Sequence, residues 1–185
     1  PISPSVVETN KNLSKLKNII GYWESGNNYG VANINSSGKR SIINVNGMTF
    51  SSLKNQQDVS NKNDRNRVWA AGRFQIIPST MYAVRVGLKL KENDRYNPIT
   101  QEKMADWMLL NYNVRRNVAN YLRGSNEGSE RDLEKAINDI GYEWASMPGV
   151  NTLKGNKVGD IQKGTGQFAA YPGFGGNPDI AKVSV

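Results

Sequence analysis

Apolar residues near the start of the chain recur at steps of three and four, which is the spacing of an amphipathic helix. They are Leu13, Leu16, Ile20 and Trp23. Residues 1–9 are predicted to form a loose lead-in, and Thr9 or Asn10 is the predicted cap at the start of the helix. The run Ser25-Gly26-Asn27-Asn28 predicts that the helix ends near residue 24, because these residue types favour the conformations that stop a helix.

Helical spacing returns in later segments of the chain. A short helix is predicted to follow Pro78 and to be closed by Gly87. Pro98-Ile99-Thr100 opens the next helix, with Thr100 as its predicted cap. The last helical pattern has an apolar stripe made of Leu133, Ala136, Ile137, Ile140 and Trp144.

Residues 29–50 have a different pattern. Two short apolar runs flank Asn46-Gly47, a dipeptide typical of a tight β-hairpin turn. The runs contain Val31, Ile34, Ile42, Ile43, Val45, Met48 and Phe50. Residues 54–67 are polar and charged, which predicts a solvated loop. Together these patterns predict an α+β chain that is mainly helical and carries one small hairpin.

Glu24 lies at the end of the first helical pattern and inside its apolar stripe, beside Leu13 and Ile20 at about 100° per residue. Partial desolvation and the negative end of the helix dipole both disfavour an ionised carboxylate in that position. A carboxyl group of this kind suits general-acid catalysis near neutral pH. The other interpretation is a snorkelling or salt-bridged glutamate at a frayed helix end.

Composition narrows the chemistry. The chain has 185 residues, enough for one domain with a substantial core, and contains no cysteine and no histidine. Thiol nucleophiles, Ser–His pairs and histidine metal sites are therefore excluded. Proton transfer would have to use Asp, Glu, Tyr, Lys or Arg, and we expect neither a metal nor another cofactor.

Charge says more about partners than about fold. The 24 Lys and Arg against 16 Asp and Glu give a formal net charge of +8, which favours contact with polyanions such as nucleic acid, anionic lipid or bacterial cell wall. Basic residues are spread along the chain without a nucleic-acid motif, so nucleic acid is not an expected partner. No apolar run has membrane-spanning length and the start does not resemble a signal peptide. Because the chain opens at Pro1, we expect a fragment or a processed form.

Three ordered motifs carry a family resemblance. They are residues 24–29, residues 70–80 and residues 143–149. In order and spacing they resemble the phage lambda lysozyme-type muramidases, which despite that name act as lytic transglycosylases on peptidoglycan. The resemblance covers roughly residues 12–172, and three motifs together are far more specific than one. The segment Gln75-Ile76-Ile77-Pro78-Ser79-Thr80 also looks like the Pro-Ser-Thr motif of the broader soluble lytic transglycosylases.

The resemblance implies a lysozyme-like fold in which the small hairpin flanks the cleft. It also implies one catalytic domain over residues 10–185, with a glycine-rich segment from about residue 149. Glu24 would be the catalytic acid, and the amide of Gln75 would hydrogen-bond substrate or orient Glu24. For Gln75 the alternative is that it satisfies the local backbone.

Four further residues are predicted to bind substrate. Ser25 is expected to support the Glu24 carboxyl, or else to cap the helix. Tyr29 and Asn33 lie in the first strand-like stretch, where N-acetyl and hydroxyl groups of a glycan would be contacted. Arg73 is expected to face muropeptide carboxylates, and the alternative is a solvated basic residue.

The spacing of acidic residues bears on the reaction. A hydrolytic glycosidase normally needs two carboxylates across the scissile bond. After Glu24 the next acidic residue is Asp58, so the hairpin segment contains none. A lytic transglycosylase needs one carboxylate, because the 6-hydroxyl of the muramic acid is the nucleophile. Asp58 or Asp64 folding back over the cleft would instead support a hydrolytic lysozyme.

Function and setting keep alternatives open at this stage. Besides the two enzymes, the same fold could be a non-catalytic cell-wall-binding module. We expect a monomer that binds peptidoglycan glycan strands in the periplasm or cell wall, by an unknown route of delivery. Phage endolysin, virion-associated enzyme, secretion-system component and interbacterial toxin all fit, and a secreted toxin would add an immunity protein or inhibitor as a partner.

Overall fold

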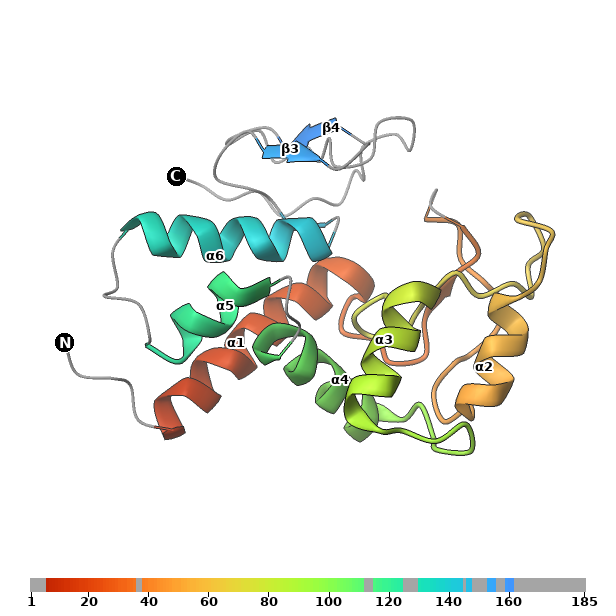
Figure 1. Ribbon diagram of the computed structural model, residues 1–185. Helices are drawn as coiled ribbons and strands as arrows, with labels where there is room; N and C mark the ends of the chain where they lie inside the picture. The colour runs from red at the N-terminus through yellow and green to blue at the C-terminus, as the bar shows by residue number, and fades with distance from the viewer. Residues whose placement is uncertain are drawn as a thin grey trace. The chain divides into compact units, whose positions relative to one another are not determined.

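The computed structural model describes residues 6–35, 38–111, 115–124, 130–144, 146–147, 153–155 and 159–161. Helices dominate these residues (Figure 1): α1 (Val6–Ser25), α2 (Phe50–Gln57), α3 (Pro78–Leu88), α4 (Pro98–Leu110), α5 (Arg116–Leu122) and α6 (Glu130–Glu143). Strand β1 (Ala32–Asn33) pairs antiparallel with β2 (Ala70–Ala71), and β3 (Leu153–Gly155) with β4 (Gly159–Ile161). The predicted class, a mainly helical lysozyme-like α+β fold, is confirmed.

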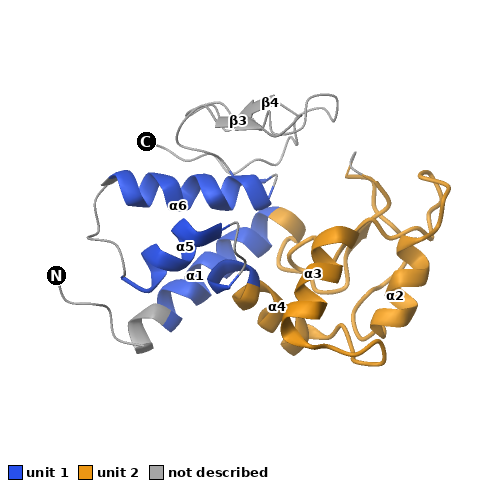
Figure 2. Cartoon of the chain, in the orientation of Figure 1, with its two compact units in different colours: residues 1–23, 108–185 blue, residues 24–107 orange. Residues whose placement is uncertain are grey.

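The chain divides into two compact units (Figure 2). Unit 1 comprises residues 1–23 and 108–185, and unit 2 comprises residues 24–107. The last two residues of α1, Glu24 and Ser25, therefore belong to unit 2. The single catalytic domain over residues 10–185 stays a prediction.

In unit 1, α5 and α6 pack together through buried apolar and polar contacts. The backbone N–H of Asn117 donates to Asp139 Oδ2 at 3.0 Å, and Arg115 pairs with Glu143 at 2.8 Å. The stripe predicted on α6 is largely confirmed, with Ala136, Ile140 and Trp144 buried. Ile137 is only half-buried, and Leu133 is 39% exposed.

The end of α1 agrees with the sequence and its start does not. Gly26 and Asn27 take φ values of 66° and 60°, the left-handed conformation that stops a helix. The helix begins at Val6, so Thr9 and Asn10 lie inside it and the prediction of a cap there is wrong. Residues 8–12 are all polar, so the apolar spacing of three and four that marks the helix does not extend back to Val6 and Val7.

The hairpin expected around Asn46-Gly47 is not formed. These two residues do make a turn, with the Met48 N–H donating to the Val45 carbonyl at 3.2 Å, but the turn does not join paired strands. Antiparallel pairing within residues 29–50 lies earlier instead, with a bridge between Asn33 and Arg40 and the Ser41 N–H donating to the Ala32 carbonyl at 2.8 Å. β1 pairs with β2 in the register Ala32↔Ala71 and Asn33↔Ala70, far along the chain. Strand patterning specifies which face is buried but leaves the pairing partner open.

The polar segment 54–67 starts as helix rather than loop. Thr49 caps α2 by accepting a hydrogen bond from the Ser52 N–H at 3.1 Å, and Phe50 and Leu53 bury its inner face. The polar residues of α2 form the outer face of a short amphipathic helix, which composition alone does not separate from a loop. Residues 58–67 follow without helix or strand, as predicted.

Two predicted helix ends move by a few residues. α3 runs past Gly87 to Leu88, and Lys89 takes the left-handed position with φ 55°. At the start of α4 the Thr100 N–H donates to Asn97 Oδ1 at 3.0 Å, so Asn97 is the cap and Thr100 is not. Gly87 serves a packing purpose: a Cβ added there would lie 2.1 Å from the ring of Trp107.

Candidate active site

Glu24 occupies the last turn of α1 and is half-buried. Leu13 and Ile20 on the same helix face are buried, so the predicted placement of the carboxylate in the apolar stripe holds. Glu24 is therefore partly exposed as a residue, on a helix face whose apolar neighbours are covered. This combination is what a general acid that must reach a bound substrate requires.

Ser25 connects the end of α1 to the second sequence motif. Its hydroxyl donates to the main-chain carbonyl of Arg73 at 2.8 Å and accepts a hydrogen bond from the Asn28 N–H at 3.1 Å. The second contact closes the turn after α1, as expected of a capping serine. The first fixes the residue next to Glu24 against residues 72–75. Support of the Glu24 carboxyl by Ser25 stays a prediction.

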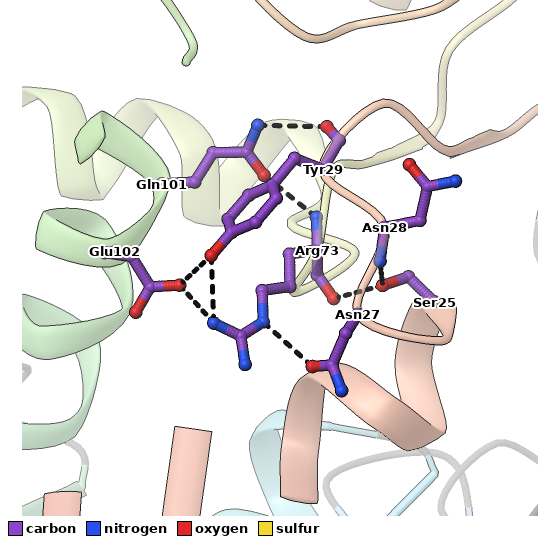
Figure 3. Close-up of polar contacts among 7 residues, drawn as sticks. All are labelled: Ser25, Asn27, Asn28, Tyr29, Arg73, Gln101 and Glu102. Carbon is purple, nitrogen blue, oxygen red and sulfur yellow. Dashed lines mark hydrogen bonds and ion pairs between the residues drawn. The ribbon is translucent and has the colours of Figure 1, made fainter. Parts of the chain in front are cut away.

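Arg73 is buried, with 6% of the residue exposed, and its guanidinium lies among polar groups of unit 2 (Figure 3). It pairs with Glu102, donates from Nε to Asn27 Oδ1 at 2.9 Å, and donates to the Tyr29 hydroxyl at 3.0 Å. The alternative that Arg73 is a solvated basic residue is wrong. Glu102 matches its charge here, and its contact with muropeptide carboxylates stays a prediction.

Tyr29 completes this cluster by donating from its hydroxyl to Glu102 Oε1 at 2.9 Å. Burial, together with the Glu102 carboxylate, raises the pKa of Tyr29 above its ordinary value of 10.0, although the Arg73 guanidinium opposes the change. The phenol therefore stays protonated at neutral pH and keeps its donor. Substrate binding by Tyr29 stays a prediction, and Tyr29 does line the hollow described below.

Gln101 and Glu102 were not predicted from the sequence. Gln101 is fully buried; its Oε1 accepts from the Arg73 N–H at 2.9 Å, and its Nε2 donates to the Tyr29 carbonyl at 3.0 Å. The side chain thus clamps both segments of the site (Figure 3). One signal was available: Gln101 takes the buried register of α4, three residues before the buried Met104. A polar residue in a buried register indicates a hydrogen-bonding role.

Gln75 has a backbone in the left-handed conformation and a polar side chain that is buried. Its φ is 46°, and only 8% of the residue is exposed. Nε2 donates to the Gly72 carbonyl at 2.8 Å and to the Val31 carbonyl at 3.3 Å, which confirms the alternative that the amide satisfies local backbone. Oε1 is buried, and no hydrogen-bond partner for it lies within the described residues. A role toward substrate or Glu24 stays a prediction.

Asn33 lies in β1, where its main-chain carbonyl accepts from the Trp69 N–H at 2.6 Å. Its side-chain oxygen accepts from Arg40 at 3.2 Å. Asn33 is half-buried, and its contact with a glycan stays a prediction.

Two hollows of unit 2 are lined by residues that follow Glu24 in the sequence, and Glu24 itself lines neither of them. The larger, about 430 Å³, is lined by Gly26, Asn27, Asn28, Tyr29, Gly30, Asn44 and Asn46. The smaller, about 300 Å³, is lined by Asn28, Gly30, Val31, Ala32, Arg40, Ser41, Ile42, Ile43 and Asn44. No acidic residue is among these lining residues. The surface is made mainly of amides and backbone, which suits an uncharged polar ligand.

The two acidic residues considered as second carboxylates are engaged elsewhere in unit 2. Asp58 is exposed after α2 and pairs with Lys54 on that helix. Asp64 is half-buried and accepts from the Asn66 N–H at 2.8 Å in a turn. Neither lines either hollow.

The fold and this site describe a protein of the lysozyme-like class. Comparison with protein families gives a match to the endolysin family over residues 16–177, which is most of the chain. The chain belongs to the endolysin family. Comparison with curated proteins and with solved structures gives no match. None of the helices in the described residues is both long and apolar enough to span a membrane.

Family membership establishes the general class of activity. Endolysins are phage-type enzymes that lyse the bacterial cell wall, so peptidoglycan is the substrate and the cell wall is the place of action. The phage endolysin setting is the one this family supports among the four left open by the sequence.

Proposed function

We propose that this endolysin is a lytic transglycosylase of the lambda lysozyme type, with Glu24 as its single catalytic carboxylate. It would cut the β-1,4 bond between N-acetylmuramic acid and N-acetylglucosamine and leave a 1,6-anhydro end. The supporting observations are the three sequence motifs, the half-buried Glu24 at the end of α1, and the absence of acidic side chains among the lining residues of both hollows.

Glu24 acts twice in this reaction. It first donates its proton to the glycosidic oxygen, which leaves with the N-acetylglucosamine as the bond to C1 of the muramic acid breaks. It then accepts the proton of the 6-hydroxyl of the same muramic acid as that oxygen bonds to C1. No water is consumed and Glu24 ends in its starting protonation state. The attacking hydroxyl is tethered to the reacting ring, so no second carboxylate has to position or activate water.

The observation that carries the proposal is the chemistry of the lining residues. A retaining or inverting glycosidase places a second carboxylate about 5–9.5 Å from the acid. The two best candidates, Asp58 and Asp64, are held by Lys54 and by a local turn. Ring closure by the 6-hydroxyl removes the need for either.

Mass spectrometry of digested peptidoglycan tests the proposal. Muropeptides should carry 1,6-anhydro ends, each lighter by one water than the reducing ends left by hydrolysis. Glu24→Gln should fold normally and lose at least about 10²–10⁴-fold of the rate, the usual share of general-acid catalysis. The matched control is Glu92→Gln, the same change at an exposed glutamate of unit 2. Digests dominated by reducing ends, or wild-type rates in Glu24→Gln, would overturn the proposal.

A further inference from the structure

Asn28 and Asn44 are the two side chains that line both hollows, separated by the backbone of Gly30. Both asparagines are exposed; Asn28 belongs to the first sequence motif, whereas Asn44 lies outside all three motifs. Figure 3 shows the side-chain amide of Asn28 pointing away from Arg73. The two amides therefore face the space that a ligand of the hollows would fill.

The backbone fixes which half of each amide meets that ligand. Asn28 Oδ1 accepts from the Gly30 N–H at 2.8 Å, and Asn44 Oδ1 accepts from the Asn46 N–H at 3.0 Å. Only an oxygen can accept these bonds, so the orientation of both amides is set. Each NH₂ group is left over, and no partner for either lies within the described residues. The pair thus presents donors.

Gly30 holds this arrangement in place. A Cβ added to Gly30 would lie 2.4 Å from Asn44 Oδ1, closer than real side chains approach. The Gly30 carbonyl also accepts from the Val45 N–H at 3.0 Å, which fixes the segment carrying Asn44 beside it. The close approach of Asn44 therefore depends on glycine at position 30.

The NH₂ groups of Asn28 and Asn44 are hydrogen-bond donors, and no carboxylate lines the hollows. A ligand that binds here must therefore offer hydrogen-bond acceptors. An N-acetyl carbonyl accepts hydrogen bonds and cannot donate through that oxygen, whereas a sugar hydroxyl does both. An amine or ammonium in place of the N-acetyl group would remove the acceptor and set a cation against the NH₂ groups. We propose that Asn28 and Asn44 bind the N-acetyl carbonyl oxygens of the glycan and make this site specific for N-acetylated sugars.

This inference rests on the proposed function for its substrate, but it is tested by binding rather than by cleavage. The probe is a tetramer of N-acetylglucosamine, compared with its fully N-deacetylated counterpart. Titration by calorimetry uses the full chain carrying Glu24→Gln, which prevents turnover. In this background Asn44→Asp is compared with Asn55→Asp, the same change at an exposed position of α2 outside both hollows.

Asn44→Asp retains an acceptor for the Asn46 N–H and replaces the donor by a second oxygen. Affinity for the acetylated tetramer should fall about tenfold, because one hydrogen bond is lost and two acceptors face each other. Affinity for the deacetylated tetramer should rise, because a carboxylate now meets its ammonium groups. Asn55→Asp should leave the ratio of the two affinities unchanged. Asn28→Asp repeats the test at the second residue if Asn44→Asp unfolds.

An unchanged ratio of affinities in both Asn→Asp variants would overturn the inference, and so would equal losses for the two tetramers. The outcome is separate from that of the proposed function. Reducing-end products in the digest would show hydrolysis and overturn the proposed reaction. The affinity ratio expected here would be unaffected. Anhydro products together with an unchanged affinity ratio in the Asn→Asp variants would support the proposed reaction. They would rule out the contact of Asn28 and Asn44 with the N-acetyl groups.

Discussion

The Ser25 hydroxyl donates to the main-chain carbonyl of Arg73 at 2.8 Å, across 48 positions of sequence. Through its side chain the same arginine reaches Asn27 and Tyr29, so one residue holds the segment after Glu24 at three points. Such multiple fixing limits the orientations available to the last turn of α1. We infer that Arg73 is a positioning residue for Glu24.

The ion pair of Arg73 with Glu102 should make a measurable contribution to stability. Because Arg73 is buried and the Glu102 side chain is 27% exposed, we expect Arg73→Met to lower the free energy of unfolding by about 1–3 kcal/mol, less than for a fully buried pair. Adding Glu102→Gln should recover part of that loss, since it removes the carboxylate left without a cation. Urea denaturation of the four proteins of this double-mutant cycle measures the coupling.

The control for this cycle is the exposed pair of Lys54 with Asp58, where solvent screening should leave no measurable coupling. Strictly additive effects of Arg73→Met and Glu102→Gln would show that the two side chains do not stabilise each other.

The positions of the acidic residues predict how the reaction responds to their removal. Asp58→Asn and Asp64→Asn should each change the rate of wall cleavage only modestly and leave the products as 1,6-anhydromuropeptides. Asp58 pairs with Lys54 at the surface and Asp64 serves a turn, so both act through local packing. Rates come from clearing of purified cell wall, and product identity from mass spectrometry. A collapse comparable to that of Glu24→Gln would indicate water as the acceptor.

The packing at Gly87 predicts that Gly87→Ala destabilises the protein, although this change normally stabilises a helix. Alanine is favoured over glycine in an exposed helix position by about 1 kcal/mol. At Gly87, however, the new Cβ would lie 2.1 Å from the Trp107 ring, and overpacking typically costs about 1–3 kcal/mol. Gly87→Ala should therefore lower the melting temperature. Val86→Ala, one residue earlier and 61% exposed, should not. A higher melting temperature for Gly87→Ala would mean that the ring moves freely.

Tyr96 predicts alkaline sensitivity. It is fully buried, and burial raises the pKa of Tyr96 far above its ordinary value of 10.0. The folded state thus keeps a proton that the unfolded chain releases. The resulting stability is fully present below pH 10 and decreases as the pH rises above it, by about 1.4 kcal/mol per pH unit.

Tyr96→Phe should flatten this alkaline limb of the stability curve. Its cost near neutral pH should be about 0.5–1.5 kcal/mol for the lost bond to the Ala71 carbonyl, which still accepts from the Ile76 N–H. Denaturant titrations of both proteins between neutral pH and pH 11 measure the difference. Parallel curves for the two proteins would show that Tyr96 ionises equally in both states.

The sequence predicted what depends on local spacing. The end of α1, the buried stripe of α6 and the placement of Glu24 follow from periodicity and from the stop signals at Gly26 and Asn27. Ser25, Arg73 and Gln75 were found through the motifs, although Arg73 was given the wrong surroundings. The burial of its charge depends on Glu102, which lies 29 positions later in a helix.

What the sequence missed depends on contacts between distant segments. Asn46-Gly47 had the right turn residues for a hairpin, but β1 bridges to Arg40 and pairs with residues 70–71. Gln101 has the same polarity as many surface residues, and only the arrival of Tyr29 and Arg73 beside α4 gives its amide a function. Asn44 was missed for the same reason. Its position depends on close contact with Gly30, which lies 14 residues earlier in the sequence.

The turn at Asn46-Gly47 also affects the chemical ageing of the protein. An asparagine followed by glycine deamidates readily when the glycine nitrogen attacks the side-chain carbonyl. Here the Gly47 N–H donates to the Tyr96 carbonyl at 3.0 Å, which holds that nitrogen away from attack. Deamidation of Asn46 therefore requires local opening of the turn. The rate of Asn46 deamidation during storage therefore reports how often the turn that lines the larger hollow opens.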